Sequence, residues 1–416
     1  MVKNLNKKFA RSESDLDLPG LFLSKYWVHS LFAIGLAIFL YSISRGLRFP
    51  NPYAISHWLY SYDFGFVKRG LVGHLVQPLL SGKGPDEIID IINWLSAAVF
   101  FGFCVTMFWP IWMLSKKMGA VPRVLYLMSC LVVYSSALVV FMAHITGYFD
   151  QLLAIFAFVS IAFIKRNRYF IPATLTVAGL LIQEIYALVG FPAVAFAVVI
   201  RVLTSERDPK KSLWTALVGK LAYVGVPAIL VFGLICWSQE RMSPAVISDV
   251  EQQMKGYNVL SKSGVWWGSY HLSHNISSNW RSERSKALER ITRVDVAKSV
   301  IPSTIFLFLA ATVFLSGARK LYLLPLLIPV VFSPLIIHFF ASDTLRFGTS
   351  MILNSFLALV AIVKIDSPTS VSRWPAIFLS ILSIAVLGLN FTTKHTLMDR
   401  QIDGQGIFSV QVRGKQ

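Results

Sequence analysis

One acidic side chain stands close to two basic ones in a segment rich in aromatic residues. Asp63 precedes Lys68 and Arg69 by five and six positions. A carboxylate in that setting can accept the proton of an attacking hydroxyl. The two cations can hold a phosphate and offset the charge of a leaving group. Gly65 and Gly70 permit tight backbone turns around them. The segment therefore predicts a general base beside a phosphate-binding pair.

Other ionisable residues stand at the ends of apolar stretches, where charge near a bilayer is costly and indicates function. Asp150 and Glu184 are predicted to join Asp63 as catalytic acids that position the substrate or a metal. We expect the remaining residues of this kind to bind substrate together with Lys68 and Arg69; they are His144, His338, Asp343 and Arg346.

Each of these residues also has a purely structural interpretation. Asp150 could cap the helix that begins at the next residue. Asp343 and Arg346 could pair with each other at i,i+3 and close a loop. Lys68 and Arg69 could extend to lipid headgroups. Glu184 stands among apolar neighbours and requires a buried partner.

The composition indicates which kind of structure positions these residues. Hydrophobic residues make up 55% of the 416 and charged residues only 14%, with a mean hydropathy of +0.61. Soluble chains average about 25% charged residues. A spanning helix needs about 20 apolar residues. We therefore predict an all-α, polytopic transmembrane bundle of about eleven spans; the apolar stretches lie near 29–45, 91–114, 124–144, 151–164, 169–182, 185–203, 213–237, 300–316, 321–340, 349–364 and 374–391.

Basic residues alternate from one connection to the next. Nineteen lysines and arginines fall on the side of the N-terminal tail, against ten in the short segments of the other side. By the positive-inside rule this predicts a multi-pass membrane protein with a cytoplasmic N-terminus. The net charge of +18 then reflects this bias and contact with anionic lipid, so no nucleic-acid partner is expected.

The orientation of the second half depends on 169–203, which offers only 35 residues for two spans. Read as one bent helix, this region would invert everything after it. We favour a short hairpin that turns at Gln183 and Glu184, since a single helix would carry Glu184 through lipid.

The predicted organisation has five parts and contains two long extramembrane connections. The parts are a cytoplasmic tail (1–28), a first transmembrane region (29–237) with an outer loop at 45–88, a long extracytoplasmic loop (238–299), a second transmembrane region (300–391) and a C-terminal tail (392–416). The outer loop is interfacial, with Trp58 and Tyr60 among the aromatic residues of an expected belt. Within the long loop, Arg281 to Lys298 predicts one basic helix.

The placement of Asp63 and Asp150 resembles that in the GT-C superfamily of multi-span glycosyltransferases. In that family the first outer loop carries a catalytic acid and interfacial helices, and a second acid commonly lies in the next outer loop. Many members have two adjacent acids in the first loop, whereas this chain has only Asp63 before Asp86 and Glu87. The resemblance implies a protein of the inner (plasma) membrane that transfers a sugar from a polyprenyl-(pyro)phosphate donor to a surface-glycan acceptor at the extracytoplasmic face.

Two other functions stay open from the sequence. O-antigen and exopolysaccharide polymerases also look similar, with ten to fourteen spans and functional arginines in outer loops; Arg69, Arg346 and those within 281–293 would match. A transporter or flippase for a lipid-linked or anionic solute belongs to another class. The expected partners are the lipid-linked sugar, the glycan acceptor, membrane lipid and other glycan-assembly proteins. No cofactor and no metal ligand is assigned, and a divalent metal is left open.

Overall fold

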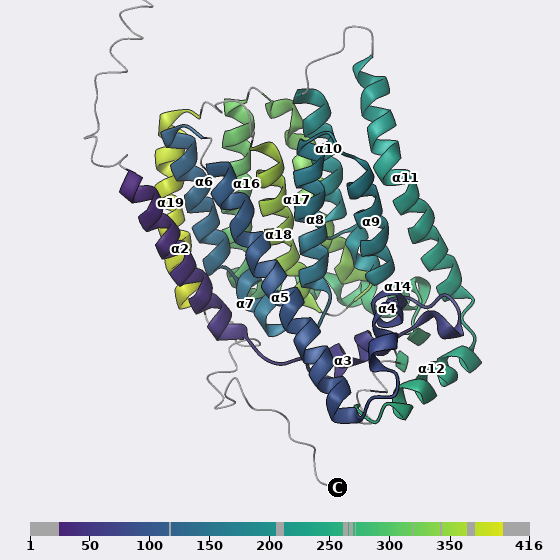
Figure 1. Ribbon diagram of the computed structural model, residues 1–416. Coiled ribbons are helices and arrows are strands. Elements are labelled where there is room, and N and C mark those ends of the chain that lie inside the picture. Colours follow the sequence, from purple (N-terminus) through teal and green to yellow (C-terminus); the bar gives the residue numbers. More distant parts are fainter. Residues whose placement is uncertain are drawn as a thin grey trace, which may run out of the picture.

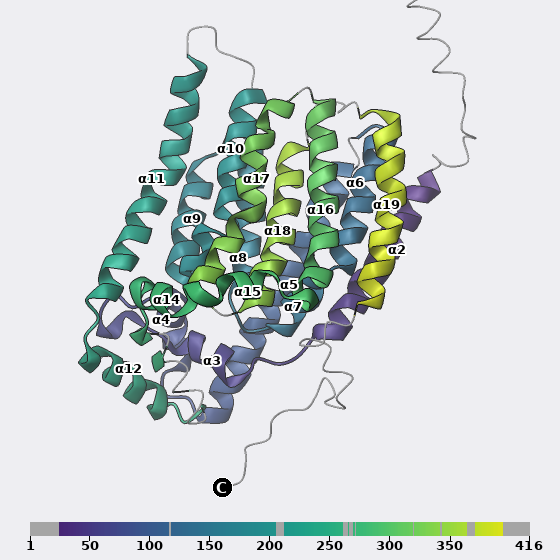
Figure 2. The same cartoon turned by 180° about the vertical axis from the view of Figure 1, so that it is seen from behind.

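The computed structural model describes residues 25–393, apart from 116–117, 205–211, 261–264, 266–268, 271, 319, 342 and 364–370. The described part is helical and contains no strand. Most helices run side by side between the two ends of a bundle, and several short helices gather at one end, the lower one in Figure 1 (Figures 1 and 2). We call this the α3–α4 end.

The helices of the bundle are α2 (Lys25–Gly46), α5 (Pro85–Ser115), α6 (Ala120–Ser135), α7 (Ala137–His144), α8 (Asp150–Lys165), α9 (Phe170–Ile182), α10 (Phe191–Thr204), α11 (Leu213–Glu240), α16 (Val294–Gly317), α17 (Leu324–Phe332), α18 (Thr344–Ile362) and α19 (Arg373–Thr392). The helices at the α3–α4 end are α3 (Pro52–Leu59), η2 (Tyr62–Phe64), α4 (Gly70–Leu80), α12 (Pro244–Gly256), α14 (Ile276–Glu283), η4 (Arg284–Lys286) and α15 (Ala287–Ile291). Three further 3-10 turns interrupt or join bundle helices: η3 (Glu184–Ala187), η5 (Leu321–Leu323) and η6 (Ser333–Phe339).

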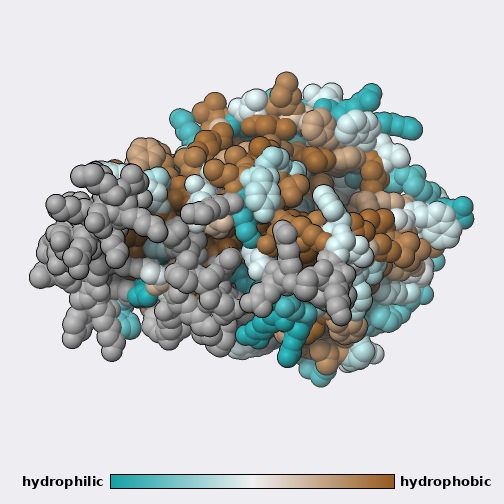
Figure 3. All heavy atoms as spheres, turned by 90° about the horizontal axis from the view of Figure 1, so that it is seen from above, coloured by the Kyte–Doolittle hydropathy of each residue, from teal (hydrophilic) through white to brown (hydrophobic). Residues whose placement is uncertain are grey.

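The length and apolar character of these helices indicate a multi-pass membrane protein. Eight helices of the described part are long and apolar enough to cross a membrane, or nine if α6 and α7, bent by 43°, form one span. Two of the predicted eleven stretches become α8 and α9, of 16 and 13 residues, which are shorter than the roughly 20 residues of a full span. Seen from the end opposite α3 and α4, hydrophobic residues occupy much of the visible face and hydrophilic ones lie in patches (Figure 3).

Helix α18 forms the centre of the bundle, because every one of its residues except Leu345 is buried. It packs against α16, α10, α17 and α8. Its Asn354 holds two helix breaks together: the side-chain amide donates to the carbonyls of Leu188 and Val330, and its oxygen accepts from the backbone N–H of Gly190. Backbone groups freed by a break must find partners in an apolar interior.

A second asparagine serves the break between α6 and α7. Asn390 on α19 donates to the Ser135 and Ser303 hydroxyls at 2.9 and 3.1 Å. Ser135 ends α6, and Ser303 lies on α16. This buried polar contact ties three helices to the point where the chain bends.

The region 169–203 folds back on itself as the hairpin interpretation expects. Helix α9 ends at Ile182, η3 follows at Glu184, and Gly190 takes a left-handed φ of 97° before α10. Arg201 near the end of α10 donates to the Asn167 side chain, just before α9, at 3.0 Å. The start of α9 and the end of α10 therefore lie together.

Two expectations about the long connections are wrong. Trp58 and Tyr60 do not form a surface belt, since they are 3% and 1% exposed; the Trp58 indole donates to the Gly147 carbonyl inside the protein. The basic helix expected from Arg281 to Lys298 is divided among α14, η4, α15 and the start of α16. In the second segment, contacts of α14, η4 and α15 with η6 override the local helical pattern.

Candidate functional site

The site begins with the unusual backbone of Arg69. This residue caps the N-terminus of α4 in the left-handed region, with φ of 64° and ψ of 10°. Such a conformation is uncommon for a residue with a Cβ and is often found where function requires it. The following Gly70 is needed because a Cβ there would approach the Tyr62 ring to 2.5 Å. The turn thereby directs a long basic side chain into the protein.

Arg69 forms an ion pair with Glu184, a residue 115 positions away in the chain. The guanidinium Nη2 lies 3.2 Å from Oε1, and Nε lies 3.5 Å from Oε2. The side chain of Glu184 is 20% exposed, whereas that of Arg69 is 9% exposed. Glu184 therefore has the buried partner that its apolar neighbours required, and it keeps some access to solvent.

Helix α3 adds two groups to this pair. Arg69 Nη1 lies 3.3 Å from the Tyr53 hydroxyl and 3.4 Å from His57 Nε2. Tyr53 and His57 are four residues apart on α3 and so share one face, with ring centroids 4.5 Å apart. The local cause is clear at the helix start: Asn51 accepts from the Ala54 N–H as an N-cap, and Pro52 follows it.

Lys68 is a buried cation, and no carboxylate of the described residues lies within ion-pair distance of it. It is 5% exposed, and its Nζ donates to the His274 carbonyl at 2.8 Å. Burial lowers the pKa of Lys68 to about 8, although the charge of Glu184 acts in the opposite direction. Two basic residues thus share one acid, which leaves an excess positive charge here. Both are buried, so the alternative of headgroup anchoring is wrong for Lys68 and Arg69.

A second ion pair lies near the first. Arg346, in the first turn of α18, donates through Nε and Nη2 to the two oxygens of Asp150 at 2.8 and 2.7 Å. Both side chains are buried. Asp150 is therefore not the N-cap of α8, a position taken by Phe149. Arg346 does not close a loop with Asp343 through its guanidinium either; Asp343 is the exposed N-cap of α18 and accepts from the Arg346 N–H at 3.4 Å.

Two tyrosines connect the two ion pairs. The rings of Tyr53 and Tyr148 lie 5.4 Å apart, and the Arg346 guanidinium lies 5.7 Å from the Tyr148 ring centroid. The order in space is Glu184, Arg69, Tyr53, Tyr148, Arg346 and Asp150. We call these six residues together with Lys68 the buried cluster. It joins α3, α4, η3, α8 and α18 at one end of the bundle.

Asp63 lies apart from the buried cluster. Its carboxylate accepts hydrogen bonds from Ser61, Gln77 and Gln253, and His74 Nδ1 lies 3.8 Å from it. These hydrogen bonds lower its pKa, that from Gln77 most of all. Its side chain is 37% exposed. The short spacing in sequence suggested a joint site with Lys68 and Arg69, but Asp63 lies at the surface and the two basic residues lie in the interior.

The two predicted histidines are buried near the same end. His144 ends α7, and its carbonyl accepts from Arg48. His338 in η6 has Nδ1 3.2 Å from the Leu335 carbonyl, while its Nε2 has no hydrogen-bond partner among the residues that the structure describes. Its ring packs edge-on against Phe347, one residue beyond Arg346. Their assignment to substrate binding stays a prediction.

The sequence did not identify Tyr53, His57, Tyr148 and Gln183 as residues of the site. The i,i+4 spacing of Tyr53 and His57 is the signal that could have found the first two. Gln183 is 1% exposed, and within the described part of the chain neither its amide nitrogen nor its amide oxygen has a hydrogen-bond partner. A buried unpaired amide costs about 1–3 kcal/mol, so its place beside Glu184 suits a polar ligand or water.

The described residues offer no group of three or more His, Cys, Asp or Glu side chains arranged to hold a metal ion. The carboxylates of Glu184 and Asp150 are instead neutralised by arginines. The cluster can therefore bind an anion at its excess positive charge.

Comparisons of this chain with protein-family models, with curated proteins and with solved structures find no match.

Proposed function

We propose that the chain is an inner-membrane glycosyltransferase. It would move a sugar from a polyprenyl-(pyro)phosphate donor to a glycan acceptor at the extracytoplasmic face. In this topology the eleven apolar stretches each cross the membrane, the N-terminus is cytoplasmic, and the α3–α4 end faces outward. The bundle ends that carry 165–168, 201 and 320 lie opposite α3 and α4, which is consistent with that orientation.

The observation that carries the proposal is the buried excess of positive charge formed by Lys68 and Arg69 around Glu184. Uncompensated charge inside an apolar protein is costly, so such an arrangement suits an anionic ligand that completes it. Its position at one end of a bundle of apolar helices suits an anion attached to a lipid chain. A phosphate headgroup on a polyprenyl tail has both properties.

In the proposed reaction, Lys68 and Arg69 bind the phosphate oxygens of the donor. The acceptor hydroxyl attacks the anomeric carbon, its oxygen forms the new glycosidic bond, and its proton passes to Glu184. The bond between the anomeric carbon and the phosphate oxygen breaks, and the lipid phosphate leaves with the electron pair, stabilised by the two cations. Glu184 is favoured as the base because it combines solvent access with a loose ion pair, whereas both oxygens of Asp150 are taken by Arg346.

A polysaccharide polymerase would use the same donor chemistry and differs in its product. A transporter would place its functional charges near the middle of the bilayer. The ionisable residues of the buried cluster instead gather at one end of the bundle, which favours transfer over transport.

The test is to replace Glu184 with Gln and to measure surface glycan together with polyprenyl-linked intermediates in cells. General-base catalysis contributes about 10²–10⁴-fold, so we expect glycan to fall by that order and the lipid-linked donor to accumulate. Glu251→Gln is the matched control, because Glu251 forms a surface pair with Lys255 at 2.8 Å. Normal glycan in the Glu184 variant at a normal protein level would overturn the assignment.

A further inference from the structure

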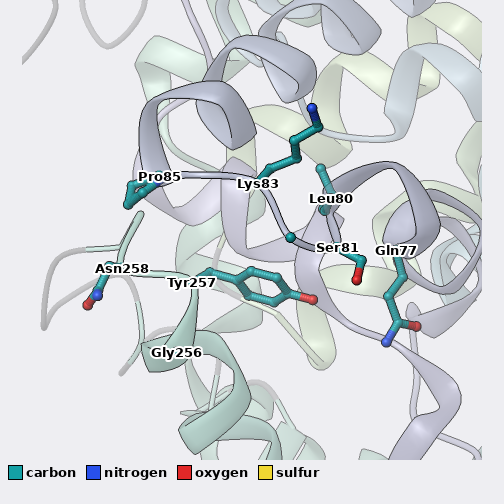
Figure 4. A pocket seen from close by; sticks show the side chains of 9 residues that line it. Gln77, Leu80, Ser81, Lys83, Pro85, Gly256, Tyr257 and Asn258 are labelled. Atoms are coloured by element: carbon teal, nitrogen blue, oxygen red, sulfur yellow. The ribbon is translucent and has the colours of Figure 1, made fainter.

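A polar hollow lies beside Asp63, at the opposite end of α4 from Arg69. It has a volume of about 350 Å³ and lies between the α4–α5 turn and the C-terminal end of α12. Figure 4 shows the Tyr257 ring extending between Asn258 on one side and Ser81 and Gln77 on the other. The size is at the lower end of the range for small-molecule pockets, about 300–1,000 Å³.

The walls of this hollow suit a neutral ligand with many hydroxyl groups. Gln77 and Asn258 provide amides that both donate and accept, and Ser81 provides a hydroxyl. The half-buried ring of Tyr257 offers a flat face for the C–H groups of a sugar. The one cation, Lys83, is already paired with Glu87 at 3.5 Å, which disfavours a phosphate.

Helix α4 connects this hollow to the buried cluster. Arg69 caps its N-terminus, and Leu80 at its C-terminus lines the hollow. Its eleven residues correspond to a length of about 16 Å at a rise of 1.5 Å per residue. Gln77 lines the hollow and also donates to Asp63, while His74 lies one turn earlier on the same face of the helix. His74 and Gln77 on α4, together with Asp63, therefore place polar groups along the part of the helix nearer the hollow, whereas residues 70–73 next to Arg69 are apolar or glycine.

We infer that this hollow is a carbohydrate-binding subsite, in which the acceptor chain is held while its reactive end lies at Glu184. The separation along α4 requires an acceptor of several sugar units. Asp63 accepts hydrogen bonds from hydroxyls of the chain on its way between the two ends. The inference rests on the transfer reaction proposed above and assigns its acceptor side.

The experiment places the photo-crosslinking residue p-benzoyl-phenylalanine at position 257 of the full-length protein in cells. After illumination, carbohydrate attached to the purified protein is measured by periodate oxidation and hydrazide labelling. We expect several-fold more label than with the same crosslinker at Trp374, which is 78% exposed and lies in the first turn of α19. Helix α19 begins at the end of the bundle opposite α3 and α4 (Figure 1). Equal labelling at the two positions, or crosslinks at 257 only to lipid or protein, would overturn the inference.

A second variant guards against an effect of the crosslinker itself. Ser81→Trp places a large ring at the mouth of the hollow, on an exposed residue outside the helices. We expect it to lower labelling at position 257 several-fold and to reduce surface glycan. Binding of farnesyl phosphate, a short prenyl phosphate used in place of the donor, should not change. If Glu184→Gln abolishes transfer while position 257 captures no carbohydrate, only the subsite is wrong. If Glu184→Gln leaves glycan unchanged, the proposed reaction itself fails.

Discussion

Asp63 and Glu184 are both single acids near basic residues, yet they lie in opposite environments. Asp63 lies at the surface and is hydrogen-bonded by neutral amides and a hydroxyl. Glu184 lies against Arg69 in the interior, beside the buried Lys68. Charges interact weakly across water and strongly where protein excludes it. The difference teaches that closeness in sequence to Lys68 and Arg69 matters less than sharing their environment.

If buried charges depend on their partners more than exposed ones do, the largest loss of folding stability should come from the buried pair of Arg346 and Asp150. Arg346→Ala leaves a buried carboxylate without its bidentate partner. Removing one member of a buried pair costs about 3–5 kcal/mol. Thermal unfolding in detergent micelles should show this loss.

Two further variants check the cause of that loss. The double variant Asp150→Ala with Arg346→Ala should recover part of the stability, because no unpaired charge then remains. Strictly additive losses, or an equal loss in Asp63→Ala, would contradict the distinction between the two regions.

The next effect tests the packing that aims Arg69 inward. Gly73 lies on α4, and a Cβ there would come within 1.8 Å of the Tyr60 carbonyl oxygen after α3. Gly73→Ala should separate α3 from α4, cost about 1–3 kcal/mol as overpacking does, and lower glycan transfer. Gly219→Ala is the control, since a Cβ there meets nothing within 4 Å. Equal thermal stability of the two variants would show that the close contact is not required.

The pH dependence of ligand binding tests whether the charge of Lys68 contributes to the site. Its pKa of about 8 means that its charge disappears as pH rises from 7 to 9. Binding of farnesyl phosphate, measured by calorimetry, should weaken by up to about tenfold over that range. Lys68→Met should bind weakly at both pH values. A tenfold change that persists in Lys68→Met would assign the titration to another group.

The same shift affects stability with a definite sign. The pKa of Lys68 in the folded protein lies below its usual 10.5, so between about pH 8 and 10.5 the unfolded chain binds more protons. The free energy of unfolding contributed by this group therefore rises with pH across that window. Comparison of the wild-type protein with Lys68→Met in chemical unfolding at pH 7.5 and 10 measures the contribution.

The smallest effect is expected at Asp63. Exposed ion pairs and hydrogen bonds are screened by water, so Asp63→Asn should change the free energy of unfolding by less than about 1 kcal/mol. Because Asp63 is assigned to the acceptor path, the variant should weaken transfer only several-fold and leave farnesyl phosphate binding unchanged. A loss of transfer as large as that of Glu184→Gln would restore Asp63 as the base and move the reaction to the surface.

The sequence by itself determined the helical membrane architecture, since apolar composition and length decide what can cross a bilayer. It also favoured the turn at Gln183 and Glu184 over one bent helix, because a single helix would have carried Glu184 through lipid. The tertiary structure alone decided which residue became that partner. Arg69 and Glu184 are 115 positions apart, and Asp150 and Arg346 are 196 apart. Local spacing carries no information on such pairs, whereas burial makes each charge depend on the one that packing brings to it.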